Sequence, residues 1–125
     1  MNILIAEDDG IIALELERIV RDAGHNVIGP VSTLEQALAY AMKADAALID
    51  LGLSDGDSGS QLGRRLIDRL GIKVIFVTGS PSSVGHGLDG SVDVVSKPFT
   101  DERILAALSK AGSRAGAILV TAQSE

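Results

Sequence analysis

Residues 94–100 read VVSKPFT, and they predict the end of a buried strand. Val94 and Val95 are β-branched residues of the kind enriched in strands. After Ser96 comes Lys97, which is followed at once by Pro98. Pro98 cannot donate a ladder hydrogen bond and therefore limits the strand. Since glycine would end a strand as well, a lysine in this place indicates a charge directed at an anionic partner elsewhere in the chain.

Further short apolar runs recur along the chain, and longer stretches with helical spacing separate them. Strands that are apolar on both sides are typical of a parallel sheet with helices on both faces. The alternation predicts an α/β fold: a doubly wound, flavodoxin-like parallel sheet of five strands in the order 2-1-3-4-5. The apolar runs are residues 3–6, 27–28, 46–49, 74–77 and 92–95.

The stretches between the runs place apolar residues at every third or fourth position, which is the spacing of one helix face. Glycine follows two of these stretches and can end a helix there. The predicted apolar faces are Ile12, Leu16, Ile19, Val20 and Ala23 before Gly24; Leu34, Ala37, Leu38, Ala41 and Met42; Leu62, Leu66 and Leu70 before Gly71; and Ile104, Leu105, Leu108 and Ala111.

The segment GSPSSVGHGLDGS, residues 79–91, should hold the fourth helix but has a poor composition for one. It carries four glycines and only two sizeable apolar residues, Val84 and Leu88. Glycine costs about 1 kcal/mol relative to alanine at each helical position. We therefore predict a fourth helix that is short or frayed, and we expect residues 79–90 to be the least ordered segment beside the sheet.

Composition limits the functions that the chain can have. Its 125 residues suit one domain, and the absence of cysteine excludes disulfides and thiolate metal sites. A net charge of −6 and only three aromatic residues argue against a nucleic-acid-binding surface. The apolar run near the N-terminus is too short for a signal peptide or membrane span. We expect a cytoplasmic protein that does not bind membranes.

Polar residues stand at the carboxyl end of four predicted strands. Glu7 and Asp8 follow the first strand, Asp50 ends the third, Thr78 the fourth and Lys97 the fifth. In the order 2-1-3-4-5 the first and third strands are neighbours, so their three carboxylates should converge at one sheet edge. Converging carboxylates repel one another unless a cation lies among them. An all-oxygen site of this kind suits Mg²⁺, or Mn²⁺.

This arrangement has a chemical interpretation. A carboxylate can attack phosphorus and form an acyl phosphate when cations neutralise the transferring group. We expect Asp50 to be the nucleophile, a metal on Asp8 and Asp50 to hold one phosphoryl oxygen, and Thr78 and Lys97 to bind the others. This explains the lysine in VVSKPFT: Lys97 places a positive charge at the site from the end of its strand.

The sequence resembles a response-regulator receiver domain of the CheY-like family. Four motifs carry the resemblance in the family's order and cover nearly the whole chain: ILIAEDD at 3–9, AALIDLGLSDGDSG at 46–59, VIFVTGS at 74–80 and VVSKPF at 94–99. The resemblance implies a phosphoacceptor signalling domain rather than an enzyme, with Mg²⁺-dependent self-phosphorylation and self-dephosphorylation. The implied donor is a histidine kinase or a histidine phosphotransfer protein.

The resemblance also assigns roles to individual residues. It implies that Asp50 is the phosphoacceptor, with Thr78 as the switch hydroxyl and Lys97 as the phosphate-binding lysine. Gly79 would be the small residue that gives the phosphoryl group access. The implied metal ligands are Glu7, Asp8, Asp50 and the backbone carbonyl of Gly52.

Two features depart from the usual pattern of the family. Val94 stands where most members carry the aromatic residue that reports phosphorylation, and the interval from Thr78 to Lys97 is short. The chain is similar to a smaller group with a threonine-glycine pair after the fourth strand and no such aromatic.

Because the Lys97 amine must turn into the site while Phe99 turns toward the core, we predict a cis peptide bond between Lys97 and Pro98.

Several residues have a simpler structural interpretation. Acidic residues before a helix, such as residues 7–9, commonly just favour its positive end. We interpret Asp55 and Asp57 as turn formers rather than metal ligands. His25 and His86 are interpreted as surface residues of turns, and Arg64, Arg65 and Arg69 as a solvated helix face rather than a docking patch.

We divide the chain into a receiver domain at 1–113 and a C-terminal tail at 114–125. Three functions remain open: a stand-alone receiver with an unidentified downstream protein, the receiver portion of a larger regulator or hybrid kinase, and a phosphohydrolase that forms an aspartyl phosphate. The last is disfavoured because Gly52 stands where such enzymes have a second aspartate. A monomer or weak homodimer is expected.

Overall fold

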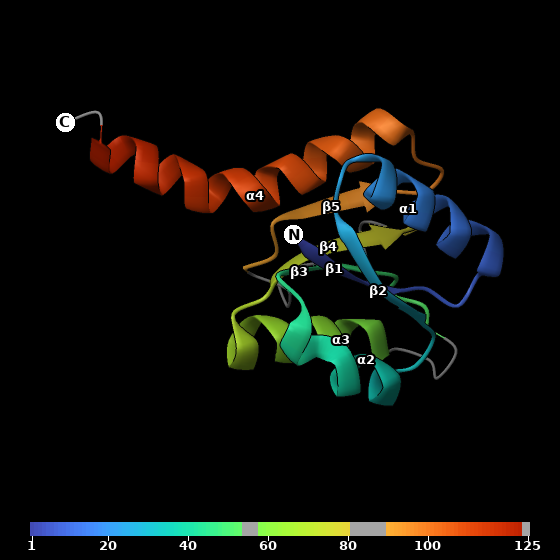
Figure 1. The fold of residues 1–125 in the computed structure, drawn as a ribbon. Coiled ribbons are helices and arrows are strands. Elements are labelled where there is room, and N and C mark those ends of the chain that lie inside the picture. Colours follow the sequence, from blue (N-terminus) through green and yellow to red (C-terminus); the bar gives the residue numbers. More distant parts are fainter. Residues whose placement is uncertain (54–57, 81–89, 124–125) are drawn as a thin grey trace.

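The computed structural model describes residues 1–53, 58–80 and 90–123, with the backbone alone after Gly112. Its five strands form one parallel sheet in the order β2-β1-β3-β4-β5, which confirms the predicted topology (Figure 1). The strands are β1 (Asn2–Ala6), β2 (Asn26–Val31), β3 (Ala46–Ile49), β4 (Lys73–Thr78) and β5 (Asp93–Ser96).

Helices cover both faces of the sheet. Figure 1 shows α1 and α4 on one face and α2 and α3 on the other. A 3₁₀ turn, η1, follows α2, and a π-helical turn, η2, follows α3. The bounds are α1 (Gly10–Asp22), α2 (Leu34–Tyr40), η1 (Ala41–Lys43), α3 (Ser58–Arg65), η2 (Leu66–Leu70) and α4 (Asp101–Gln123).

Alternate residues of each central strand enter two separate apolar cores. In β4, Ile75 and Val77 pack under α1 and α4, while Val74 and Phe76 pack under α2 and α3. The same alternation holds in β1, where Ile3 and Leu4 belong to opposite cores. Because successive strand side chains point to opposite faces, a strand buried on both sides has no polar position. This explains the continuous apolar runs in the sequence.

Four residues of the predicted apolar helix faces are exposed instead, so those predictions were wrong: Ala23, Met42, Leu70 and Leu105. Ala23 is exposed at the C-cap of α1, where the helix ends. Met42 is 78% exposed because α2 ends at Tyr40 and the 3₁₀ turn breaks the helical spacing. Leu70 lies at the end of the π-helical turn η2, whose wider turn shifts the side-chain positions. Leu105 is partly exposed at the edge of a surface pocket.

Two further expectations concern the backbone. The Lys97–Pro98 peptide bond is cis, as predicted, and Gly29–Pro30 is also cis. The fourth helix was expected within residues 79–91, of which 81–89 lie outside the described residues. Among the helices that the structure describes, none is both long and apolar enough to span a membrane.

Gly63 offers a test of how tightly α3 packs on the sheet. A Cβ atom at Gly63 would collide with the ring of Phe76, which is fully buried. We therefore expect Gly63→Ala to lower the free energy of unfolding by about 1–3 kcal/mol through overpacking, despite alanine's better helix propensity. Chemical denaturation measures this. Gly10→Ala is the matched control, since a Cβ there meets no atom within 4 Å, and equal stability of both variants would contradict the packing argument.

Candidate functional site

The turn after β1 fixes the first acidic residues. The amide of Glu7 donates to the carbonyl of Val31 at 2.9 Å. Asp9 is the N-cap of α1, and its side chain accepts hydrogen bonds from the amides of Ile11 and Ile12. The helix-end interpretation of the acidic run therefore holds for Asp9. Glu7 does not cap the helix, because its carboxylate accepts from the amide of Asp9 at 3.2 Å.

Asp50 follows β3 and is held by backbone contacts on both sides. Its amide donates to the carbonyl of Ala6 at 2.9 Å, and its Oδ1 accepts from the amide of Gly52 at 3.2 Å. Gly59, the second residue of α3, lies so close that a Cβ atom would collide with the backbone of Asp50 and Leu51. Our sequence analysis quoted Gly59 within a motif but missed this need for a glycine.

Glu7, Asp8 and Asp50 form an acidic cluster. One carboxylate oxygen from each residue lies within 4.8 Å of the others. Glu7 and Asp50 are only 3% and 9% exposed, whereas Asp8 is exposed, so the cluster is open to solvent on one side. Glu7 Oε1 is buried and makes no aligned hydrogen bond within the described part of the chain. A cluster of hard oxygen donors with one such buried atom fits a small divalent cation.

Lys97 reaches the same cluster from β5. Its Nζ lies 2.8 Å from Glu7 Oε1 and 3.4 Å from Asp50 Oδ1. The first contact is an ion pair without hydrogen-bond alignment. Burial lowers the pKa of Lys97, but the two carboxylates outweigh it and raise the pKa above its usual value. The side chain is therefore a charged ammonium held between two buried carboxylates, as VVSKPFT indicated.

The carboxyl group of Glu7 has a raised pKa. Burial raises the pKa of Glu7 to about 7, and the neighbouring Asp50 adds to the shift, although Lys97 and the amide of Asp9 oppose it. One ammonium therefore does not fully compensate two buried carboxylates. Near neutral pH the cluster can bind either a proton or a further cation.

Thr78 ends β4 beside this cluster and is buried. Its Oγ1 accepts from the amide of Ser80 at 3.0 Å, and its carbonyl accepts from the amide of Lys97 at 2.8 Å. Gly79 is exposed, and a Cβ atom there would meet nothing within 4 Å. All the strand-end residues named from the sequence therefore lie along one edge of the sheet.

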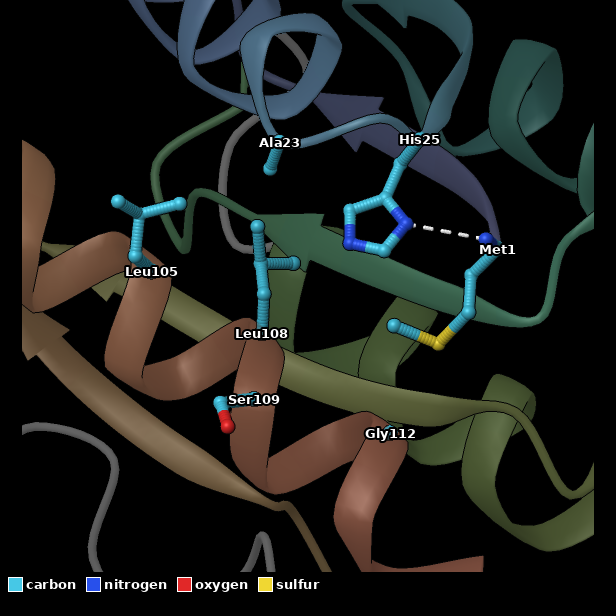
Figure 2. A pocket seen from close by; sticks show the side chains of 7 residues that line it. All are labelled: Met1, Ala23, His25, Leu105, Leu108, Ser109 and Gly112. Carbon is cyan, nitrogen blue, oxygen red and sulfur yellow. Dashed lines mark hydrogen bonds between the residues drawn. The ribbon is translucent and has the colours of Figure 1, made fainter. Parts of the chain in front are cut away.

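The remaining candidates lie elsewhere. His25 sits at the opposite end of β1, where its Nδ1 is 3.0 Å from the Met1 amine. It lines a pocket of about 350 Å³ between α4 and the turn before β2. Figure 2 shows the side chains around this pocket. Arg64 of α3 pairs with Asp68 of η2, four residues further along the chain. Asp55, Asp57 and His86 fall outside the described residues.

A second charged group was missed in the sequence analysis. Arg103 of α4 grips the carboxylate of Asp93 with two hydrogen bonds of 2.7 and 2.9 Å, and Lys110 adds a third contact at 3.1 Å. Arg103 is the main cause that keeps the pKa of Asp93 well below its usual range. The sequence carried no signal for the pairing beyond opposite charges on two adjacent elements.

Comparison with known proteins supports one family. A family model for the response regulator receiver domain matches residues 3–109. The chain is 34% identical over 114 residues to the phyllosphere-induced regulator PhyR of Methylorubrum extorquens, covering 88% of this chain and 43% of that protein. The response regulator PhyR from Brucella abortus has a similar structure, with a TM-score of 0.84, 32% identity, and coverage of 97% of this chain and 51% of that one.

A third relative was solved with ligands. A response regulator from Burkholderia pseudomallei, whose structure contains a phosphorylated aspartic acid, a calcium ion and citrate, superimposes with a TM-score of 0.75 at 25% identity. That match covers 94% of this chain and 73% of the other. The chain thus spans about half the length of the two PhyR proteins.

The raised pKa of Glu7 predicts how stability depends on pH without divalent cations. The folded state holds this proton more tightly than the unfolded state, so the contribution is fully present below about pH 4.5 and is lost as pH rises through about 7. We expect the free energy of unfolding to fall by roughly 2–3 kcal/mol across that range. Glu7→Gln should flatten the profile, as measured by denaturation in a chelator. A slope unchanged in the variant would place the titrating group elsewhere.

Proposed function

The chain belongs to the response regulator receiver domain family, and on that premise we propose that Asp50 accepts a phosphoryl group from a histidine kinase or a histidine phosphotransfer protein. The observation that carries this proposal is the Lys97 ammonium held between Glu7 and Asp50 at the sheet edge. It puts a fixed positive charge within 3.4 Å of the proposed nucleophile. A nucleophilic carboxylate beside a preorganised cation is what phosphoryl transfer requires.

In the proposed reaction a carboxylate oxygen of Asp50 attacks the phosphorus of the donor's phosphohistidine. A new P–O bond forms as the P–N bond breaks, and the electron pair of that bond returns to the imidazole nitrogen. The products are an acyl phosphate on Asp50 and a free histidine on the donor. Attack by water on the acyl phosphate later releases inorganic phosphate and restores the carboxylate.

The acidic cluster fits the Mg²⁺, or Mn²⁺, that the family typically uses. The residues that would hold it are Glu7, Asp8, Asp50 and the backbone carbonyl of Gly52, and the buried Oε1 of Glu7 supports this choice. When bound, such an ion neutralises charge on the transferring phosphoryl oxygens. The open side of the cluster at Asp8 leaves a path for the ion and the donor.

Lys97 and Thr78 would bind the remaining phosphoryl oxygens. Once Asp50 is phosphorylated its carboxylate loses its negative charge, so the Lys97 ammonium would gain more from the dianionic phosphoryl group than from Asp50 Oδ1. The Thr78 hydroxyl would leave the amide of Ser80, which it now accepts from at 3.0 Å, and donate to phosphate. Gly79 would leave room for the group, as the open space around its Cα allows.

The surface beside the site suits a docking donor. Ile11 and Leu14 lie one turn apart at the start of α1, directly after the acidic cluster, and are strongly exposed. Exposed apolar side chains next to a charged site are typical of an interaction surface. We propose that the phosphodonor covers them while it delivers its phosphohistidine to Asp50.

The proposed unit is the receiver domain at residues 1–113, with 114–125 as a tail. The family model ends at residue 109, close to that boundary. The greater length of the PhyR relatives favours a receiver portion of a larger regulator, while a stand-alone regulator remains the alternative.

Phosphorylation tests the proposal directly. On incubation with acetyl phosphate and Mg²⁺, we expect intact mass spectrometry to show one added phosphoryl group, which a chelator prevents and Asp50→Asn abolishes. Asp22→Asn is the control, because Asp22 is an exposed carboxylate at the far end of α1. Equal phosphorylation of wild type and Asp50→Asn would show that the nucleophile is another residue.

A further inference from the structure

Strand β5 carries Lys97 but has few contacts of its own. It has four residues and lies at the end of the sheet, paired with β4 alone. Val95 is its one fully buried residue. Edge strands expose a row of unpaired backbone groups, so contacts from other elements must hold and cover the strand.

Arg103 of α4 provides such contacts with β5. Its guanidinium grips both carboxylate oxygens of Asp93, at 2.7 and 2.9 Å, and Nη2 also donates to the carbonyl of Val94 at 3.1 Å. Asp93 Oδ1 further accepts from the amide of Val94 at 2.8 Å. The Asp93 side chain is only 11% exposed, so this is a shielded contact with the planar two-point geometry of a strong arginine–carboxylate pair.

The same strand determines where Lys97 lies. The amide of Val92 donates to the carbonyl of Val74 at 2.7 Å, and the amide of Lys97 donates to that of Thr78 at 2.8 Å. The Arg103 contacts fall between these two bonds. A slip of β5 by one residue would move the Lys97 backbone by about 3.3 Å, which is enough to break its contacts with Glu7 and Asp50. Smaller displacements would weaken both contacts.

We propose that Arg103 is a positioning residue: by holding Asp93 and the Val94 carbonyl it fixes β5 so that the Lys97 ammonium lies between Glu7 and Asp50. Neither the family assignment nor the motifs in the sequence point to this role. It rests on the proposed function of Asp50 as phosphoacceptor, because its effect on the reaction is exerted through Lys97.

A second arginine provides a matched control. Arg18 of α1 also makes a two-point contact, to Asp101 of α4, at 3.1 and 3.0 Å. It anchors the same helix as Arg103 does, but through α1 instead of β5. Arg18→Met and Arg103→Met therefore remove similar chemistry from two different places.

The first measurement is amide hydrogen exchange in the unphosphorylated protein. We expect Arg103→Met to speed exchange at Val92 and Lys97 about tenfold, as loss of charged hydrogen bonds implies. Arg18→Met should leave these two amides within about twofold of wild type. Equal protection in wild type and Arg103→Met would overturn the proposal, and so would the same acceleration in Arg18→Met, since it would indicate general destabilisation.

The second measurement is the rate of phosphorylation by acetyl phosphate with Mg²⁺ in a double-mutant cycle. Arg103→Met should slow it about tenfold, Lys97→Met should slow it as well, and the double variant should match Lys97→Met alone. Independent, multiplying effects would overturn the positioning role. If wild-type Asp50 gains no phosphoryl group, the proposed function is refuted, and so is the effect of Arg103 on the reaction. Hydrogen exchange would still show whether Arg103 holds β5.

Discussion

The contact on which the site depends is the Lys97 ammonium lying between the buried carboxylates of Glu7 and Asp50. Parallel topology creates it, because the carboxyl ends of β1, β3 and β5 share one edge. Two buried carboxylates with oxygens within 4.8 Å of each other would strongly destabilise the fold without a cation. The polar residues that end otherwise apolar strands are thus tolerated because they come together. Loss of Lys97 would leave the two buried carboxylates without their compensating charge.

The site is only partly compensated in the absence of a metal, and this is the physical basis of its proposed function. One lysine faces two buried acids, so the pKa of Glu7 stays raised to about 7. The cluster can be relieved by a proton, by a divalent cation, or by a phosphoryl group that draws Lys97 away from Asp50. Competition among these three would make the arrangement of the strand ends sensitive to phosphorylation. In this proposal β5 and Thr78 would respond together, since Lys97 and Thr78 are joined by a backbone hydrogen bond of 2.8 Å.

Much of this was predictable from the sequence. Apolar runs gave the strands, their alternation gave the fold class, and polar residues at strand ends placed Glu7, Asp8, Asp50 and Lys97 together. The cis bond at Pro98 was also predicted. What could not be predicted depends on local departures from regular geometry: the π-helical turn that exposes Leu70 is invisible to a simple helical spacing.

Contacts between side chains of different elements are equally hidden. The pairing of Arg103 with Asp93 needs the packing of α4 on β5, which the sequence pattern does not specify. The most direct test of the account is a crystal structure with Mg²⁺ and beryllofluoride, a phosphoryl mimic. We predict that beryllofluoride binds to Asp50. Lys97 Nζ should then contact a fluorine atom instead of Asp50 Oδ1, and the Thr78 hydroxyl should turn from the Ser80 amide to a second fluorine atom. A complex bound at a different residue, or a Lys97 that keeps both present contacts, would contradict the account.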